Sequence, residues 1–293
     1  MSLSLVLKVN SVGDQVRFGG KHSHFGYCEI HSVFNNAVNF YIKRDTILSL
    51  VTRSVGGGPN NIVIDVDSLS FVKSIYMDKS KIVLNDSFIC DIESSLQYNS
   101  DLFIVSKDLE LFKKGLGKFE DILRKKAPAL SAAFLIDKRR LNFFITPFEK
   151  NLAYSLDLFS NEVLDGKLES VSRLKGLGFG LTPQGDDILD GFMIALLVYE
   201  KLTGANTGDI RKKIFNLSRG SNIISDTFLY YASLGLLYER VKTLVLSLFL
   251  NDPVIIENAV SKLLNIGETS GADISTGFLL MSKKLMQGGI KWL

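Results

Sequence analysis

The residue pattern of this 293-residue chain changes abruptly near Ser106. Before it, short runs rich in Val, Ile and aromatic residues alternate with Gly, Asn and Asp, as in NIVIDV and KIVLN. This pattern is typical of strands joined by turns and predicts an antiparallel or barrel-like β unit. After Ser106, apolar residues recur every three or four positions, which indicates amphipathic helices. The chain is therefore predicted to be an α+β protein, with a β-rich N-terminal part packed on a helical C-terminal part.

We expect a β-rich domain at residues 1–105, a mixed connecting region at 106–166 and a helical domain at 167–293. In the connecting region, residues 106–126 should form a helix that ends before Pro128. The runs AAFLID and LNFFITPF that follow could be two more strands, although such short apolar runs do not decide between helix and strand. In the helical domain, helices are expected at about 183–202, 225–250, from Pro253 onward, and 272–287.

Charge and cysteine content narrow the class of protein. The net charge is only +3, and basic residues are not concentrated on one stretch, so no nucleic-acid partner is predicted. No run reaches the ~18–20 apolar residues of a membrane span, and the N-terminal stretch lacks a signal-peptide pattern. Cys28 and Cys90 form no C-x-x-C motif and are expected to be free, buried thiols. A cytoplasmic protein fits these features.

The stretch KGLGFGLTPQGDDILDGF, residues 175–192, carries the strongest functional signal. Thr182 is a suitable N-cap, Pro183 suits the first helical position, and acidic residues in the first turn favour the helix dipole. A glycine-rich loop entering a helix also suits an anion. At ~100° per residue, Asp186, Asp187 and Asp190 fall on one arc, opposite the apolar positions of the helix. Capping explains only part of this pattern.

Three carboxylates on one arc repel one another unless they are solvated or bound to a cation. An anion bound beside them would also need a counter-charge. Mg²⁺ held by one or two carboxylates and bridging to an anionic substrate would supply it. A mobile Lys or Arg would also do; Lys175 is close in sequence, whereas Arg219 is not. No cofactor is certain from the sequence. Mg²⁺ is the possible one, with Asp187 and Asp273 as its candidate ligands.

A second segment, residues 267–278, repeats the pattern G-x-D-I-x-x-G-F of residues 185–192. The two copies are either related elements that converge on one site or two ordinary capped helices. The hydroxyl-rich stretch at 218–227 is a further helix start that could line the same pocket or serve only as a cap. The candidate catalytic residues are Asp186, Asp187 and Asp273, and the candidate substrate-binding residues are Gly178, Gly180, Thr182, Gly185, Ser270 and Gly271.

Two N-terminal features remain ambiguous. The stretch SVGGGPNN, residues 54–61, lacks the Lys-Ser/Thr of a nucleotide-binding P-loop and is either a tight turn or a loop that offers backbone N–H groups to a ligand. His22 and His24 could form a metal pair on a strand, but no third ligand follows at a clear spacing. A surface or packing role for these histidines and for His31 is favoured.

The motif GLGFGLTPQGDDILDGF resembles the G-x-G-x-G-L-T-P-x-G-D-D-x-L-x-G signature of the AllH-type family. IGETSGADISTGFLL resembles the C-terminal motif of that family, and HSVFNNAVNF and GGGPNNIVI are similar to its N-terminal blocks. The resemblance implies a cytoplasmic subunit of oxamate carbamoyltransferase in allantoin or purine-nitrogen breakdown, working with two other subunits. The residues at matching motif positions are Gly178, Gly180, Thr182, Gly185, Asp186, Asp187, Gly271 and Asp273.

The implied reaction converts oxalurate and phosphate into oxamate and carbamoyl phosphate. Because phosphate itself attacks the carbamoyl carbon, no nucleophilic side chain is needed, and the protein contributes positioning and electrostatic stabilisation. Two alternatives stay open. One is a stand-alone Mg²⁺-dependent hydrolase or phosphotransfer enzyme, whose helix-start aspartates would resemble those of ADP-ribosylglycohydrolases. The other is a non-catalytic subunit that binds a ligand or acts as a scaffold.

Overall fold

The computed structural model describes residues 5–16, 26–43, 46–78, 81–220 and 222–288. The chain divides into two compact units. The β unit comprises residues 1–101 together with Leu237–Glu239, and the helical unit comprises 102–236 and 240–293. An α+β fold with a β-rich N-terminal part is thereby confirmed. Within the described ranges, no helix has both the length and the apolar character that a membrane crossing requires.

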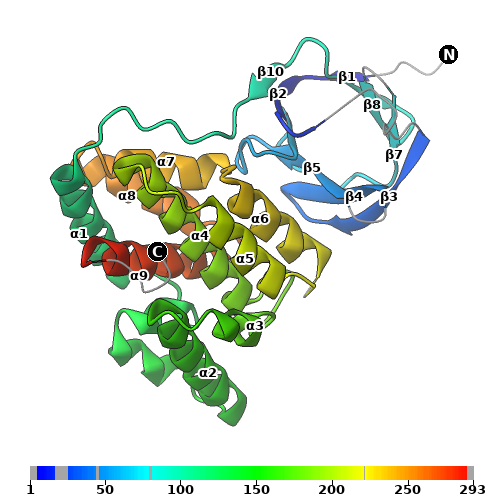
Figure 1. Ribbon diagram of the computed structural model, residues 1–293. Coiled ribbons are helices and arrows are strands. Elements are labelled where there is room, and N and C mark those ends of the chain that lie inside the picture. Colours follow the sequence, from blue (N-terminus) through cyan, green and yellow to red (C-terminus); the bar gives the residue numbers. More distant parts are fainter. Residues whose placement is uncertain (1–4, 17–25, 44–45, 79–80, 221, 289–293) are drawn as a thin grey trace. The chain divides into compact units, whose positions relative to one another are not determined.

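The β unit contains a single sheet of ten strands in the order β1-β9-β8-β7-β3-β4-β5-β6-β2-β10 (Figure 1). The strands are β1 (Leu5–Leu7), β2 (Val9–Gly13), β3 (Gly26–Val33), β4 (Ala37–Lys43), β5 (Thr46–Thr52), β6 (Asn61–Ile64), β7 (Ile75–Met77), β8 (Lys81–Leu84), β9 (Phe88–Asp91) and β10 (Leu96–Tyr98). Most neighbouring strands are antiparallel, as predicted. Three pairs are parallel, namely β1 with β9, β10 with β2, and β5 with β6, so the sheet is mixed.

The sheet curls because β1 and β2, which follow each other in the chain, lie near opposite ends of the strand order. Only Lys8 separates β1 from β2, yet β1 is the first strand in the order and β2 is the ninth. The two ends of the sheet must therefore come together, which confirms the barrel-like prediction. Residues 5–13 and 88–98 run in the same direction along this seam, and that explains two of the parallel pairs. Register shifts in three of the antiparallel pairs are typical of strongly bent strands.

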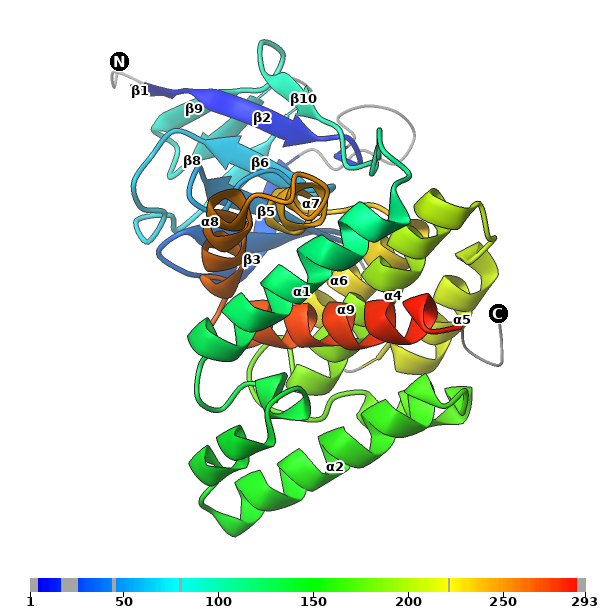
Figure 2. The ribbon, with the colours of Figure 1, turned by 90° about the vertical axis from the view of Figure 1, so that its left-hand side faces the viewer.

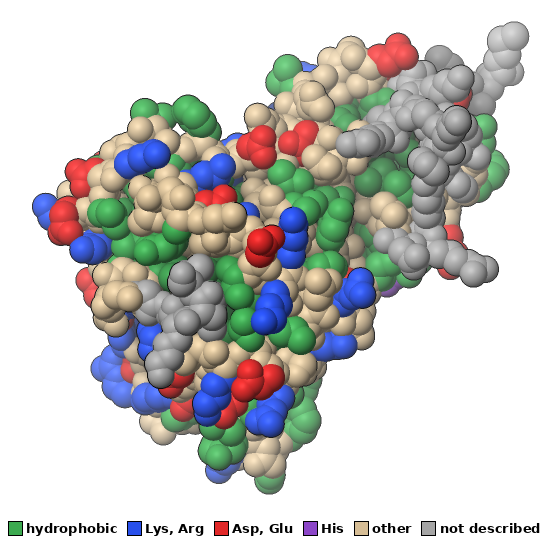
Figure 3. Space-filling model, in the orientation of Figure 1, with side chains coloured by type: hydrophobic (Ala, Val, Ile, Leu, Met, Phe, Trp, Pro, Cys, Tyr) green, Lys and Arg blue, Asp and Glu red, His purple; other side chains and the backbone are tan. Residues whose placement is uncertain are grey.

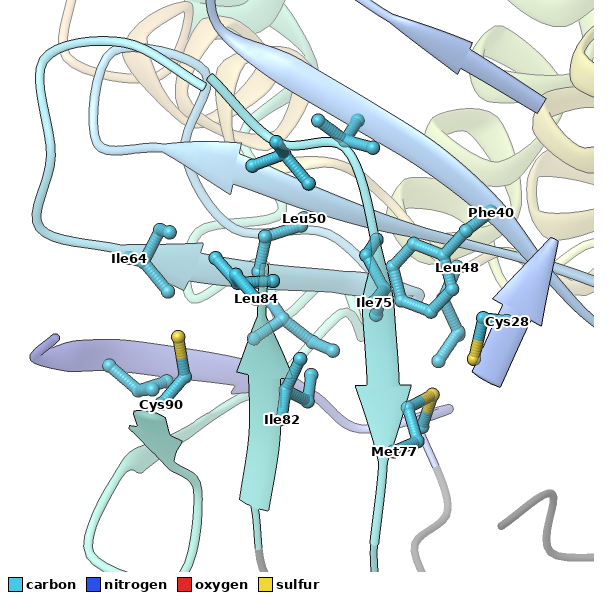
Figure 4. Packing of buried hydrophobic residues seen from close by; sticks show 14 of the residues in the cluster. Cys28, Phe40, Leu48, Leu50, Ile64, Ile75, Met77, Ile82, Leu84 and Cys90 are labelled. Atoms are coloured by element: carbon cyan, nitrogen blue, oxygen red, sulfur yellow. The ribbon is translucent and has the colours of Figure 1, made fainter. Parts of the chain in front are cut away.

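The interior of the curled sheet is filled by apolar side chains from most of its strands. Phe40, Leu50 and Ile82 are fully buried there, and Figure 4 shows them among their neighbours. Cys28 and Cys90 belong to the same core as free thiols, as predicted. Burial raises their pKa values to about 11 and about 12, respectively, so both thiols stay protonated and unreactive at neutral pH.

The glycine run at residues 56–58, which follows β5, packs against other residues of the β unit. The Gly57 N–H donates a hydrogen bond to Glu239 Oε2 at 2.5 Å. A Cβ atom on Gly57 would lie 2.4 Å from the Tyr98 ring, and one on Gly58 would lie 2.2 Å from the Tyr238 ring. The glycines are therefore required by close packing, which supports the tight-turn interpretation. His22 and His24 lie outside the described residues, and His31 contacts Ser32 and the Tyr41 ring.

The helical unit is built around two long helices that pack against each other, α4 and α9, with α1 against the other side of α9 (Figure 2). On the face drawn in Figure 3, acidic and basic side chains are interspersed over this unit. Its helices are α1 (Leu109–Lys126), α2 (Pro147–Leu164), α3 (Val171–Leu174), α4 (Gln184–Thr203), α5 (Gly208–Ser218), α6 (Ile223–Leu234), α7 (Glu239–Ser247), α8 (Pro253–Leu264) and α9 (Ser270–Met286), with 3₁₀ helices η1 (Ala132–Leu135), η2 (Lys138–Phe143) and η3 (Leu168–Ser170).

In this unit the structure decides one alternative that the sequence left open and shows that one prediction was wrong. The runs AAFLID and LNFFITPF form η1, η2 and the start of α2 instead of strands. Asp137 caps η2 by accepting the Arg139 N–H, and Thr146 and Glu149 form a capping box for α2. The expected helix at 225–250 is interrupted. It ends at Gly235, which has a φ of +78°, and the Leu237 N–H then bonds to the Ser100 carbonyl in the β unit.

Candidate functional site

Helix α4 starts one residue later than predicted, and Thr182 is not its cap. The N-cap is Pro183, which has a φ of −60° and a ψ of 147°. Its carbonyl accepts the N–H groups of Asp186 and Asp187. The Thr182 hydroxyl instead lies 2.7 Å from the Ser270 hydroxyl in the first turn of α9. The two motif copies, 88 residues apart at these positions, thus meet at their helix starts.

The glycines that the two motif copies share lie where α4 and α9 approach each other closely. A Cβ atom on Gly191 would lie 2.2 Å from the Ile274 carbonyl oxygen, and one on Gly277 would lie 2.3 Å from the Ile188 carbonyl oxygen. Gly185 and Gly271 face the carbonyl oxygens of Leu174 and Leu263, each at 1.9 Å from a Cβ position. Close packing of backbone is thus sufficient to require glycine at all four positions.

The three aspartate side chains of α4 are buried, so they are not solvated, which was one of the two alternatives that the sequence left open. Helix α4 is buried on every side from Gln184 to Val198. Asp186 is only 1% exposed, and its two oxygens are used separately. Oδ1 accepts the Gly176 N–H at 2.8 Å, and Oδ2 accepts the Ser225 hydroxyl at 2.6 Å. Asp186 therefore connects the glycine loop to the start of α6.

Asp187 and Asp273 occupy equivalent positions in the two copies, and both are buried. Asp273 Oδ1 accepts the Ala132 N–H at 2.5 Å, whereas the Oδ2 atoms of Asp187 and Asp273 have no hydrogen-bond partner among the described residues. Burial raises the pKa of Asp273 to about 7. Burial, with repulsion from Asp273, raises the pKa of Asp187 well above its usual value. Both shifts favour the protonated form of the pair.

Asp190, one turn further along α4, is a separate case. It is buried, and burial raises its pKa to about 8. The carboxyl groups of α4 thus differ in how they are accommodated inside the protein. Asp186 accepts two hydrogen bonds, whereas burial raises the pKa values of Asp187 and Asp190 and so favours the neutral form of both.

The predicted metal ligands do not make a complete magnesium site. No group of three or more His, Cys, Asp and Glu side chains within the described ranges could hold a metal ion. Mg²⁺ requires six oxygens in near-octahedral geometry and usually keeps several waters. Asp187 and Asp273 offer two unpartnered oxygens in a buried position, so the other ligands of a bound Mg²⁺ would have to come from water or substrate.

The glycine loop before α4 is the accessible part of the site. Gly176, Gly178 and Gly180 all have positive φ, at +70°, +121° and +82°, respectively. The loop is fixed from within, because the Phe179 N–H donates to Gln184 Oε1 and a Cβ atom on Gly178 would overlap that side chain. The N–H groups of Gly178, Gly180 and Leu181 form no hydrogen bond with any described residue. These N–H groups are free to donate hydrogen bonds to a bound anion.

Three residues of the site were either left open or missed by the sequence analysis. The helix start at 218–227 joins the site through Ser225, which was predicted only as an open alternative. Ala132, which donates its N–H to Asp273, was missed, and the sequence carries no signal for a backbone donor 141 residues away. Gln184 was also missed as the residue that fixes the loop, although its place in the first turn of α4 was visible.

The fold and the site define an α+β protein whose helical unit carries an open glycine loop and buried carboxyl groups at the starts of two crossed helices. Residues 174–282 match the family described as oxamate carbamoyltransferase subunit AllH, and residues 9–99 match the AllH family N-terminal domain. The chain belongs to the AllH family. No solved structure matches it.

Proposed function

We propose that this chain is the subunit of an oxamate carbamoyltransferase that binds the anionic substrate, with the glycine loop at 175–183 as the binding element. The observation that carries the proposal is the set of unbonded N–H groups at Gly178, Gly180 and Leu181 in an accessible loop. Membership of a family described as a subunit of this enzyme supplies the reaction class. The partner subunits would complete the enzyme.

In the proposed reaction, a phosphate oxygen attacks the carbamoyl carbon of oxalurate. The bond between that carbon and the oxamate nitrogen breaks, and the nitrogen takes up a proton, giving oxamate and carbamoyl phosphate. Negative charge develops on the carbamoyl oxygen during the attack, so fixed N–H donors aimed at the site would stabilise the transition state. The loop amides are suited to this role or to holding the phosphate, because the loop is already rigid before a ligand arrives.

The predicted site residues divide into three roles under this proposal. Gly178, Gly180 and Thr182 belong to the loop that contacts the substrate. Asp186 positions that loop through its bond to Gly176. The buried pair Asp187 and Asp273 lies in the first turns of α4 and α9 with Gly185, Ser270 and Gly271, and we propose that it stores the proton that the departing oxamate nitrogen requires.

The test uses the complex that this chain forms with its partner subunits, assayed for phosphate release from oxamate and carbamoyl phosphate. Gly180→Ala should lower turnover strongly, because an L-residue disfavours the φ of +82°. The matched control is Gly204→Ala at the C-cap of α4, where φ is +79° and a Cβ atom likewise meets nothing within 4 Å. Both variants carry the same backbone strain, so equal turnover in the two would refute the loop assignment. Phosphate or oxamate binding by a complex that never turns over would instead favour the non-catalytic subunit.

A further inference from the structure

Lys175 and Arg219 are 44 positions apart in the sequence but belong to loops that meet in the helical unit. A Cβ atom on Gly220 would lie 3.3 Å from Lys175 Nζ and 3.9 Å from its Cε. The Lys175 ammonium therefore lies directly against the backbone next to Arg219. Gly220 has a φ of +96°, so glycine suits both the backbone conformation and this close approach.

Two carboxylates hold these loops together without neutralising the cations. Asp186 accepts the Gly176 N–H, next to Lys175, and the Ser225 hydroxyl from the start of α6. Asp226 accepts the Gly220 N–H through both of its oxygens, at 2.7 and 2.8 Å. The backbone around both cations is therefore fixed by hydrogen bonds that involve neither the Lys175 nor the Arg219 side chain.

Neither cation has a partner among the described residues. The side chains of Lys175 and Arg219 form no ion pair and no hydrogen bond there. Many other cations of the helical unit are paired, including Arg211 with Glu200, Lys283 with Glu120 and Lys284 with Asp165. Lys175 is half-buried and Arg219 is exposed, so both remain accessible to a ligand. Lys175, which begins the glycine loop, thus lies against the segment that carries Arg219, and the two side chains form no ion pair within the described residues.

We propose that Lys175 and Arg219 are the substrate-binding cations of this site and that they neutralise phosphate together with the carboxylate of the co-substrate. This inference rests on the proposed function, because it concerns the same glycine loop. Two anions that must react with each other repel, and loop amides alone carry only partial charge. A guanidinium suits both phosphate and carboxylate with two parallel hydrogen bonds, and an ammonium suits phosphate as a point charge, so both cations are expected to contribute to phosphate binding.

The experiment measures inorganic phosphate binding to the full chain by calorimetry at constant ionic strength. Lys175→Ala and Arg219→Ala should each weaken binding about tenfold or more, the usual effect of losing a hydrogen bond to a charged group. The control is Lys213→Ala, an exposed and unpaired cation on α5, which should bind phosphate like the wild type. In the complex, Lys175→Ala should also raise KM for phosphate.

The outcomes separate this inference from the function on which it rests. If Gly180→Ala loses phosphate but Lys175→Ala and Arg219→Ala retain it, the loop binds the anion and the cation assignment is wrong. If the Lys213→Ala control weakens binding as much as the two variants, the effect is one of net charge, and the assignment is wrong again. If the wild-type chain binds no phosphate alone or in the complex, both the inference and the loop site fail.

Discussion

The starts of α4 and α9 carry the same motif but are built for different tasks. They share Gly, Asp, Ile, Gly and Phe at equivalent positions, and the glycines at both starts lie against backbone carbonyl oxygens. The differences lie outside these identities. Helix α4 is preceded by an open loop with three glycines of positive φ, and Asp186 in its first turn corresponds to Ala272 in α9. The repeated glycines thus serve packing, and the open loop and Asp186 are the parts of the candidate site that only α4 carries.

The largest expected effect tests whether the repeated glycines are required by packing. Gly191→Ala and Gly277→Ala should each destabilise the helical unit by about 3 kcal/mol or more, because the added methyl group would overlap a carbonyl oxygen of the opposing helix. Urea unfolding followed by the helical circular dichroism signal measures this. Gly117→Ala in α1 is the control. Its Cβ position meets nothing within 4 Å, so a gain of about 0.5–1 kcal/mol is expected. A mild effect at Gly191 would mean that the helices can separate without cost.

The second prediction concerns Asp186, which has no carboxylate counterpart in α9. Asp186→Ala should cost about 2–3 kcal/mol and release the glycine loop, since the Gly176 N–H and the Ser225 hydroxyl both lose their charged partner. Phosphate binding should fall in parallel. Asp209→Ala, an exposed acidic residue in the first turn of α5, loses only a helix-dipole contribution of about 0.3–1 kcal/mol. Asp186→Ala with wild-type phosphate affinity would show that the loop does not depend on this carboxylate.

The third prediction concerns the pH dependence of stability that Asp190 causes and that Thr276, its counterpart in α9, cannot cause. Burial raises the pKa of Asp190 in the folded protein to about 8 from the ordinary aspartate value of 3.8, so the folded state binds the proton more tightly. Its contribution to stability is complete below the unfolded pKa and is lost as pH rises toward 8. We expect the free energy of unfolding to fall between pH 5 and 8. Asp190→Asn should make that slope less steep by up to about 1 kcal/mol per pH unit. An identical slope in the variant would contradict the raised pKa.

The same comparison explains how far the sequence could be interpreted. The strand-rich and helix-rich halves and the repeat at 271–278 follow from local spacing, which the chain carries within a few residues. The contacts that define the site are between segments distant in sequence. Nothing near Asp186 in the sequence indicates Ser225, and nothing near Lys175 indicates Gly220. Thr182 shows the same limit. Its position suits a cap, but the hydroxyl of Ser270 is a competing partner that only tertiary structure supplies.

The smallest expected effect tests whether the two motif copies are coupled at their starts. Thr182→Val and Ser270→Ala should each cost about 1 kcal/mol, because both remove the hydrogen bond between the two hydroxyls at 2.7 Å. If that bond is the only link, the double variant should cost less than the sum of the two, with a coupling energy of about 0.5–1 kcal/mol. Thr203→Val is the control, since its hydroxyl bonds to the Tyr199 carbonyl within α4 and should show no coupling to Ser270→Ala. Additive costs at Thr182 and Ser270 would mean that the two helix starts are held together by the glycine crossing alone, and that the loop before α4 can move without disturbing α9.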